Sequence, residues 1–146
     1  MPRPAATLIV CLFVLQLCAC SQPASPEQQV RDVIAAGEQA AEKRDLGGLM
    51  ELVSARYGDE SGRDAESLEQ YVRGYLMLHP SIHLLTRVEA IDFPYEDMAR
   101  VRVTVGSLGH GAAEGASFDV AAEVEQLEIE LVREGEDWRV RRATRL

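Results

Sequence analysis

The sequence predicts an α+β domain in which three helices precede an antiparallel sheet of about four strands, with a signal peptide ahead of the domain. Three observations lead to this prediction. Apolar residues recur at helical spacing between Val30 and His79, and beyond Ser81 they alternate with polar residues. The chain also begins with a short apolar run that ends at Cys20.

The apolar run at the start has the length of a signal-peptide core. Ala5 to Leu17 is almost wholly apolar, but it is shorter than the roughly 20 residues that span a bilayer. It ends in Leu17-Cys18-Ala19-Cys20, followed by polar Ser21. This ending resembles the bacterial lipobox, in which the last Cys receives a diacylglyceryl group. The resemblance implies cleavage after Ala19 and lipid attachment at Cys20, and an ordinary secretory signal is the alternative.

The anchor prediction divides the chain into a signal peptide (1–19), a lipidated Cys with a short tether (20–25) and one domain (26–146). The five-residue tether Ser21–Ser25 extends to under about 18 Å, which predicts a domain close to the membrane. Ser21 beside the lipidated Cys resembles the outer-membrane sorting pattern of Gram-negative bacteria. The resemblance implies the periplasmic face of the outer membrane.

The composition predicts an acidic domain without disulfides. The formal net charge is −9 at pH 7, and cleavage would also remove the positive Arg3. Such a domain repels nucleic acid and anionic lipid, so we expect no nucleic-acid binding and membrane contact only through the lipid on Cys20. Cys11 and Cys18 would leave with the signal peptide, so packing alone would hold the domain together.

Each predicted helix begins at a side chain suited to capping, namely Ser25, Asp45 and Asp64. The first helix runs to about residue 44, with Pro26 at its first position and Gln28 completing a capping box. The second is short, and the third ends before Pro80. Between the last two, Ala55–Arg63 reads as a loop.

Alternation predicts two paired strands after Ser81, joined by a turn at Pro94–Asp97. Pairing them about the centre of that turn places Val88 opposite Val103 and Ala90 opposite Val101 on one face. On the other face it places Glu89 opposite Arg102. The segment from Gly106 to Ser117, rich in Gly and Ala, then reads as a connection.

The last hairpin is predicted to turn at Glu134-Gly135. This turn sets apolar residues opposite each other, Leu131 with Trp138 and Ile129 with Val140. On the other face it sets opposite charges together, Glu130 with Arg139 and Glu128 with Arg141. The agreement of both faces supports the register.

Three helices followed by a sheet, with the terminal segment Glu-Gly-Glu-Asp-Trp-Arg-Val, resemble the nuclear transport factor 2-like superfamily, which has a cystatin-like cone fold. The resemblance covers about Pro26 to Arg145. It implies a curved sheet whose concave face is covered by the helices. The superfamily includes ketosteroid isomerase, scytalone dehydratase and polyketide cyclases, together with many non-catalytic binding domains, so the fold does not choose among them.

An isomerase-type pocket enzyme needs a carboxylate on the concave face as its general base. The side chains predicted to face inward contain none: Ile82, Leu84, Thr86, Val88, Ala90, Val101, Val103, Val105, Leu127, Ile129, Leu131, Trp138 and Val140. The sheet carboxylates Glu89, Glu128 and Glu130 are predicted to face outward. The pattern therefore argues against this chemistry on the sheet, and helices or loops stay open as sources of catalytic groups.

The sequence predicts no catalytic residues, no metal site and no cofactor. His79 and His83 bracket Pro80, which breaks the helix that would place both on one metal. The loop at 57–64 lacks the ligand order of a calcium loop, because Arg63 stands where an oxygen ligand belongs. Tyr57, Asp59, Arg63 and Asp64 instead predict a loop that hydrogen-bonds to itself, caps the third helix and lines the mouth of an open fold.

Five side chains combine an apolar body with a polar tip and are candidates for a pocket lining: Tyr57, Tyr71, Tyr75, His79 and Trp138. Ordinary core packing is the alternative for each of them. The favoured hypothesis is a non-catalytic envelope lipoprotein whose cone domain binds a small apolar ligand or an envelope protein. The alternatives are a pocket enzyme of the isomerase, dehydratase or cyclase type, and a structural module that forms a homodimer.

Overall fold

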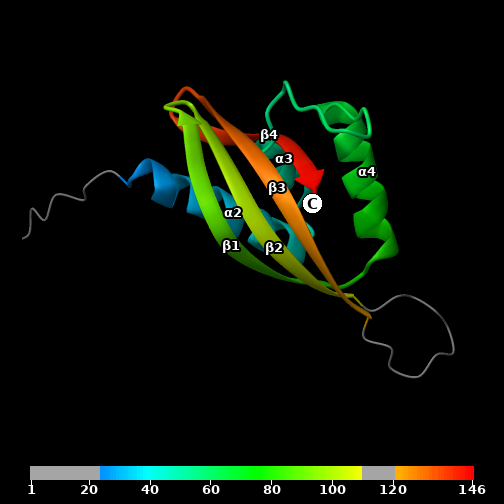
Figure 1. Cartoon of the computed structure of the whole chain (residues 1–146). Coiled ribbons are helices and arrows are strands. Elements are labelled where there is room, and N and C mark those ends of the chain that lie inside the picture. Colours follow the sequence, from blue (N-terminus) through cyan, green and yellow to red (C-terminus); the bar gives the residue numbers. More distant parts are fainter. Residues whose placement is uncertain (1–23, 110–120) are drawn as a thin grey trace, which may run out of the picture.

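A computed structural model describes residues 24–109 and 121–146. In this part of the chain, three helices precede a four-stranded antiparallel sheet with the strands in chain order (Figure 1). The elements are α2 (Pro26–Glu42), α3 (Leu46–Glu51), α4 (Ala65–Leu78), β1 (Ile82–Tyr95), β2 (Met98–Gly109), β3 (Ala121–Glu134) and β4 (Asp137–Arg145).

The predicted α+β architecture is confirmed. Residues 106–109 extend β2 instead of belonging to the connection. The predicted signal peptide, Cys20 and most of the connection after Gly109 lie outside the described residues. Within the described part of the chain, no helix is both long enough and apolar enough to cross a bilayer.

The three predicted helix caps are confirmed. Ser25 Oγ accepts from the Gln28 amide at 3.2 Å. The carboxylates of Asp45 and Asp64 accept from amides in their own helices at 2.9 and 2.8 Å. The capping box at the first helix is wrong, because the Gln28 side chain donates to Asp32 at 2.8 Å instead of returning to the cap.

The core lies between α2 and the concave face of the sheet, which curves around the helix (Figure 1). Val30 and Ile34 project from α2 onto the sheet. The sheet supplies fully or nearly fully buried side chains from β2, β3 and β4: Ala99, Val101, Val103, Leu131 and Trp138. Most of the predicted inward face is therefore confirmed, and its burial is the main stabilising contribution to the fold.

A β-bulge changes the predicted pairing of β1 with β2. Val88 lies opposite Val103 as predicted, but the register then shifts, so that Ala90 faces Arg102 and Ile91 faces Val101. Ile91 accordingly takes the core position predicted for Ala90. The extra residue is Glu89, which has no partner in the ladder, as is usual at a bulge.

The β3–β4 hairpin turns one residue later than predicted. Gly135 adopts a φ of 68°, which favours glycine, and Glu134 pairs with Asp137. Leu131 therefore faces Val140, and Trp138 faces Arg133. The displacement between the strands is two residues, so each side chain keeps its predicted face although its partner is different.

The predicted charge pairs across β3 and β4 are also wrong. Glu130 faces Arg142 and Glu128 faces Thr144, because the register shifts between Glu130 and Leu131 and leaves Arg141 without a partner in the ladder. Glu128 instead lies 3.5 Å from Arg100 on β2, and Arg139 lies 3.7 Å from Glu134. These contacts join partly exposed side chains, which stabilise a fold only slightly.

Both edges of the sheet are covered. At the β1 edge, Glu42 accepts from the Leu84 amide at 3.2 Å and Glu38 accepts from the Thr86 amide at 3.0 Å. At the β4 edge, the segment after α3 pairs with Val140 through two hydrogen bonds, of 2.8 and 2.9 Å. The free backbone groups of the edge strands are thus partly satisfied within the domain.

Helix α4 stands beside the sheet, whereas α2 crosses its concave face (Figure 1). Leu76 is the buried side chain of α4, and several of its other apolar residues are exposed. Its C-terminal end is held by Arg44, whose guanidinium donates to the carbonyl oxygens of Leu76 and Pro80. One long side chain therefore joins the end of α2 to the end of α4.

Candidate ligand-binding site

A hollow of about 500 Å³ lies between α4 and the far part of the sheet. We call it the α4 pocket. Its walls come from the Tyr57–Arg63 loop, from the first turns of α4 and from the ends of β3 and β4. A hollow of this volume falls within the range of small-molecule sites.

Asp59 organises the loop on one side of the α4 pocket. Its side chain is only 4% exposed, and its carboxylate accepts four hydrogen bonds, from the Tyr57 hydroxyl, the Ser61 amide, and the amide and Nε of Arg63. The Nε bond is 2.8 Å long. The predicted self-bonded loop is thereby confirmed, and its rigidity comes from this carboxylate.

The same contacts shift the pKa values of Asp59 and Tyr57. Burial by itself would raise the pKa of Asp59, but the hydrogen bonds and the charge of Arg63 hold it below the usual value of 3.8. Burial, together with the nearby negative charge of Asp59, raises the pKa of the Tyr57 hydroxyl to about 12. At neutral pH the loop therefore contains an ionised Asp59 and a neutral Tyr57.

Arg63 also forms part of the pocket wall. Its guanidinium carbon lies 4.6 Å from the centroid of the Tyr71 ring on α4, a cation–π contact. Asp59 fixes the Arg63 guanidinium, so this contact positions the Tyr71 ring. Tyr71 is 55% exposed. The loop thus holds the beginning of α4 in place beside the hollow.

The inner wall of the α4 pocket is apolar, and its rim is polar. Leu68 from α4 and Leu127 and Ala143 from the sheet form the wall. The rim carries Glu60 and Arg145, and Arg145 pairs with Glu125 at 2.8 Å. An apolar wall with polar groups at the opening suits a ligand that is largely apolar and carries a polar end.

A second hollow, of about 590 Å³, lies at the opposite end of the domain. We call it the Trp138 pocket. Its apolar walls are Val33, Leu52 and Trp138, and its rim carries several carboxylates. In the described part of the chain, no group of three or more His, Cys, Asp or Glu side chains is placed to hold a metal ion. The rim is therefore a solvated acidic surface.

The five predicted lining residues are not brought together. Tyr57 and Tyr71 line the α4 pocket, and Trp138 lines the other hollow. Trp138 is 3% exposed, and its indole N–H donates to Gln29 at 3.1 Å. Tyr75 and His79 contact neither hollow.

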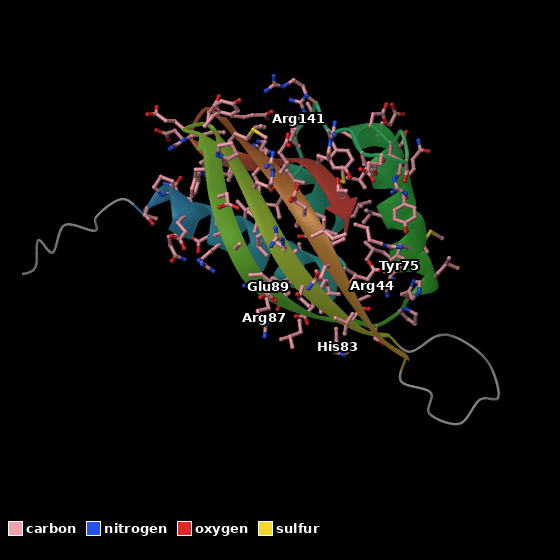
Figure 2. All side chains as sticks on the ribbon, viewed as in Figure 1. Arg44, Tyr75, His83, Arg87, Glu89 and Arg141 are labelled. Carbon is pink, nitrogen blue, oxygen red and sulfur yellow. The ribbon has the colours of Figure 1, made fainter. Side chains whose placement is uncertain are left out.

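Tyr75 and His79 stack on each other along α4, with ring centroids 4.0 Å apart. Figure 2 shows Tyr75 on α4 with Arg44 nearby. The His79 ring also contacts the Tyr75 carbonyl oxygen at 2.9 Å. These aromatic residues therefore lie at the C-terminal end of the helix, outside both the α4 pocket and the hollow beside Trp138.

Several residues of the α4 pocket gave no signal in the sequence, namely Leu68, Leu127, Ala143, Thr144 and Arg145. Leu127 was predicted only as an inward core residue. Ala143, Thr144 and Arg145 come close to the loop because the β4 edge pairs with the segment after α3, and Leu68 comes from α4. This tertiary pairing has no periodicity in the sequence that could reveal it.

The arrangement favours binding over acid–base chemistry. Asp59 is a weak base, because its pKa is low and four donors already occupy its oxygens. Tyr57 is a weak acid at neutral pH, and its proton already lies in a hydrogen bond to Asp59. A general acid–base pair works best with pKa values near the operating pH, and these two groups are shifted away from it.

Comparison with known proteins identifies the fold. No protein-family model matches the chain, and no curated protein matches it. Among solved structures, a proposed scytalone dehydratase from Novosphingobium aromaticivorans gives a TM-score of 0.71 at 14% identity, covering 80% of this chain and 80% of that chain.

Two further solved structures have a similar fold. A proposed dehydratase of the nuclear transport factor 2-like family from Streptomyces avermitilis gives a TM-score of 0.70 at 15% identity, covering 84% of this chain and 97% of that chain. A Nostoc punctiforme protein of unknown function with a cystatin-like fold gives 0.67 at 12% identity, covering 84% and 91%. The chain has the nuclear transport factor 2-like fold. At these identities the likeness establishes the fold and leaves the activity to be argued from the site.

Proposed function

We propose that this chain is a lipid-anchored envelope protein whose cone domain binds a small, largely apolar molecule in the α4 pocket. The observation that carries the proposal is the pocket itself, a hollow of about 500 Å³ with an apolar wall and a rigid polar loop at its opening. Three charged side chains of its lining, Asp59, Arg63 and Arg145, are already paired within the protein, so a ligand contributes mainly apolar contacts. The fold is shared with two proposed dehydratases, a class of enzyme that binds a small molecule.

Native mass spectrometry of residues 21–146, purified from the protein's own envelope, tests the binding proposal. We expect a discrete small-molecule adduct that is retained in Tyr95→Ser and lost or reduced at least tenfold in Tyr71→Ser. Both tyrosines are mostly exposed, at 69% and 55%, and only Tyr71 lines the α4 pocket. An adduct that is retained in both variants would place the binding site outside the α4 pocket.

A protein without any adduct would contradict small-molecule binding and favour an envelope protein partner or a homodimer. The same spectrum distinguishes a monomer from a dimer.

The anchor proposal rests on the Leu17-Cys18-Ala19-Cys20 sequence. We propose removal of residues 1–19, acylation of Cys20 and location at the periplasmic face of the outer membrane. Multiple acyl chains are needed for lasting attachment, because one chain binds only marginally. The intact mass of the membrane-extracted protein should show the cleavage and the added acyl mass. A Cys20→Ala protein that still fractionates with membranes would contradict the anchor.

An enzyme of the dehydratase or isomerase type is the second candidate. It is favoured by one observation, the adjacent Tyr57 hydroxyl and Asp59 carboxylate in the pocket lining, 3.2 Å apart. If the identified ligand were chemically altered by the wild-type domain and unaltered by Asp59→Asn, the enzyme reading would replace the binding one. Unaltered ligand in both cases would support binding alone.

A further inference from the structure

The position of the tether relative to the two hollows restricts how a ligand can reach the α4 pocket. The described chain begins at Ala24, whose carbonyl oxygen accepts from the Gln29 side chain at 2.9 Å. Gln29 in turn accepts from the Trp138 indole at 3.1 Å. The end of the tether is therefore fixed beside Trp138, at the start of β4.

The α4 pocket lies at the other end of β4. Its lining includes Ala143, Thr144 and Arg145, whereas the tether end is near Trp138. Strands rise about 3.3 Å per residue, so the pocket opening is roughly 20 Å from the tether end. Figure 1 shows α2 beginning on the left of the domain and α4 standing on the right.

The charges near the tether end also prevent this end of the domain from inserting into the bilayer. Exposed carboxylates gather in the turns between β1 and β2 and between β3 and β4: Asp92, Glu96, Asp97, Glu136 and Asp137. Anionic lipid headgroups repel such a surface within a Debye length of about 8 Å at physiological salt. The acidic turns would therefore remain in water, between the bilayer and the pocket.

The rim of the α4 pocket agrees with an opening to water. It carries the acidic residue Glu60 and the basic residue Arg145. Arg145 keeps 73% of its side chain exposed while paired with Glu125. A pocket that received a lipid directly from a bilayer would have to bring these charges to the apolar boundary, which is unfavourable.

We infer that the α4 pocket opens away from the membrane and takes a water-dissolved amphipathic molecule, not a lipid extracted from the bilayer. The inference rests on the proposed function, because it requires both the anchor at Cys20 and a ligand in this pocket. The ligand exchanges with the aqueous space of the envelope, and its polar end lies at the charged rim.

The orientation is tested with the full acylated protein in vesicles of phosphatidylethanolamine and phosphatidylglycerol that contain a rhodamine-labelled lipid. A donor dye is attached at Glu60→Cys, on the pocket rim, or at Glu136→Cys, in the β3–β4 turn; both positions are exposed. We expect energy transfer to be several-fold stronger from the Glu136 position. Equal transfer, or stronger transfer from the Glu60 position, would overturn the orientation.

The same two dye positions in a Cys20→Ala protein distinguish a wrong orientation of the domain from the absence of the anchor. Loss of transfer at both positions supports the anchor and makes the comparison valid. Transfer that persists without Cys20 would contradict the proposed anchor, and with it the basis of the orientation.

The ligand class is tested with unacylated residues 21–146 and vesicles that contain a self-quenched, NBD-labelled phosphatidylethanolamine. We expect no increase in emission, because the domain does not extract lipid. An increase that is retained in Tyr95→Ser and lost in Tyr71→Ser would overturn the inference while still supporting a ligand in the α4 pocket.

Discussion

The side chain of Arg44, just after α2, donates a 3.0 Å hydrogen bond to the carbonyl oxygen of Pro80, just after α4. It also donates to Leu76 at 2.5 Å, so one guanidinium satisfies two carbonyl groups at the end of α4. Arg44 has a φ of 58°, a left-handed conformation that costs a non-glycine residue roughly 1–2 kcal/mol. The side-chain contacts offset this backbone cost.

We predict that Arg44→Ala lowers the free energy of unfolding by about 1–3 kcal/mol, because it removes both bonds and keeps the left-handed backbone. Arg44→Gly loses the same bonds but relieves the backbone, so it should cost roughly 1 kcal/mol less than the alanine change. Urea denaturation of the three proteins measures the difference. Equal losses would show that the backbone at this position is not strained.

Asp59 should make stability dependent on acid pH. Because its folded pKa lies below 3.8, the ionised carboxylate stabilises the fold above about pH 4–5, and this contribution is lost as pH falls through the folded pKa. Asp59→Asn should cost about 1.5–3 kcal/mol at pH 7 and clearly less at pH 3. Glu96→Gln, at an exposed turn, is the control and should change stability by under about 0.5 kcal/mol. A loss for Asp59→Asn that is the same at both pH values would contradict the ionised state.

Tyr57 should titrate with a folded midpoint at about 12, because burial and the charge of Asp59 raise its pKa. Its raised pKa means that the neutral hydroxyl stabilises the fold below about pH 10, and that this contribution is lost as pH rises towards the folded value. Absorbance near 295 nm follows tyrosinate formation. Tyr57→Phe should remove the transition at about pH 12. A curve that this substitution leaves unchanged would contradict the raised pKa of Tyr57.

Trp138→Ala should lower the free energy of unfolding by about 3–5 kcal/mol. The ring is 3% exposed and lies in the core cluster. The Phe93 ring meets it edge-on at a centroid distance of 5.9 Å. Tyr95→Ala, at a mostly exposed aromatic residue, is the matched control and should cost under about 1 kcal/mol. A loss below about 1 kcal/mol for Trp138→Ala would mean that the indole is not part of the core.

The two hairpins show what alternation could and could not predict. Period-two patterning placed Leu131, Trp138 and Val103 on the inner face correctly, because burial acts on each residue independently of its partner. Which residues face each other across two strands depends also on where the turns and bulges occur. The extra residue at Glu89 and the left-handed Gly135 change the partners, and the alternating pattern gives no sign of where a bulge will occur.

The candidate site was predictable only where its groups are close in sequence. The Tyr57–Asp59–Arg63 network lies within one loop, and its mixture of acceptors and donors was recognisable. Alternation along the strands gives no sign of Asp59 in the pocket, because this carboxylate comes from a loop. The apolar wall of Leu68 and Leu127 depends on the position of α4 beside the sheet, which local patterns do not determine.

Glu38 and Glu42, one helical turn apart on α2, accept hydrogen bonds from the free amides of β1. Each time α2 detaches, these amides become available to a strand of another molecule. Packing of α2 against the sheet therefore protects the β1 edge from edge-to-edge polymerisation. The stability of this packing should determine how long the protein remains unaggregated at high concentration.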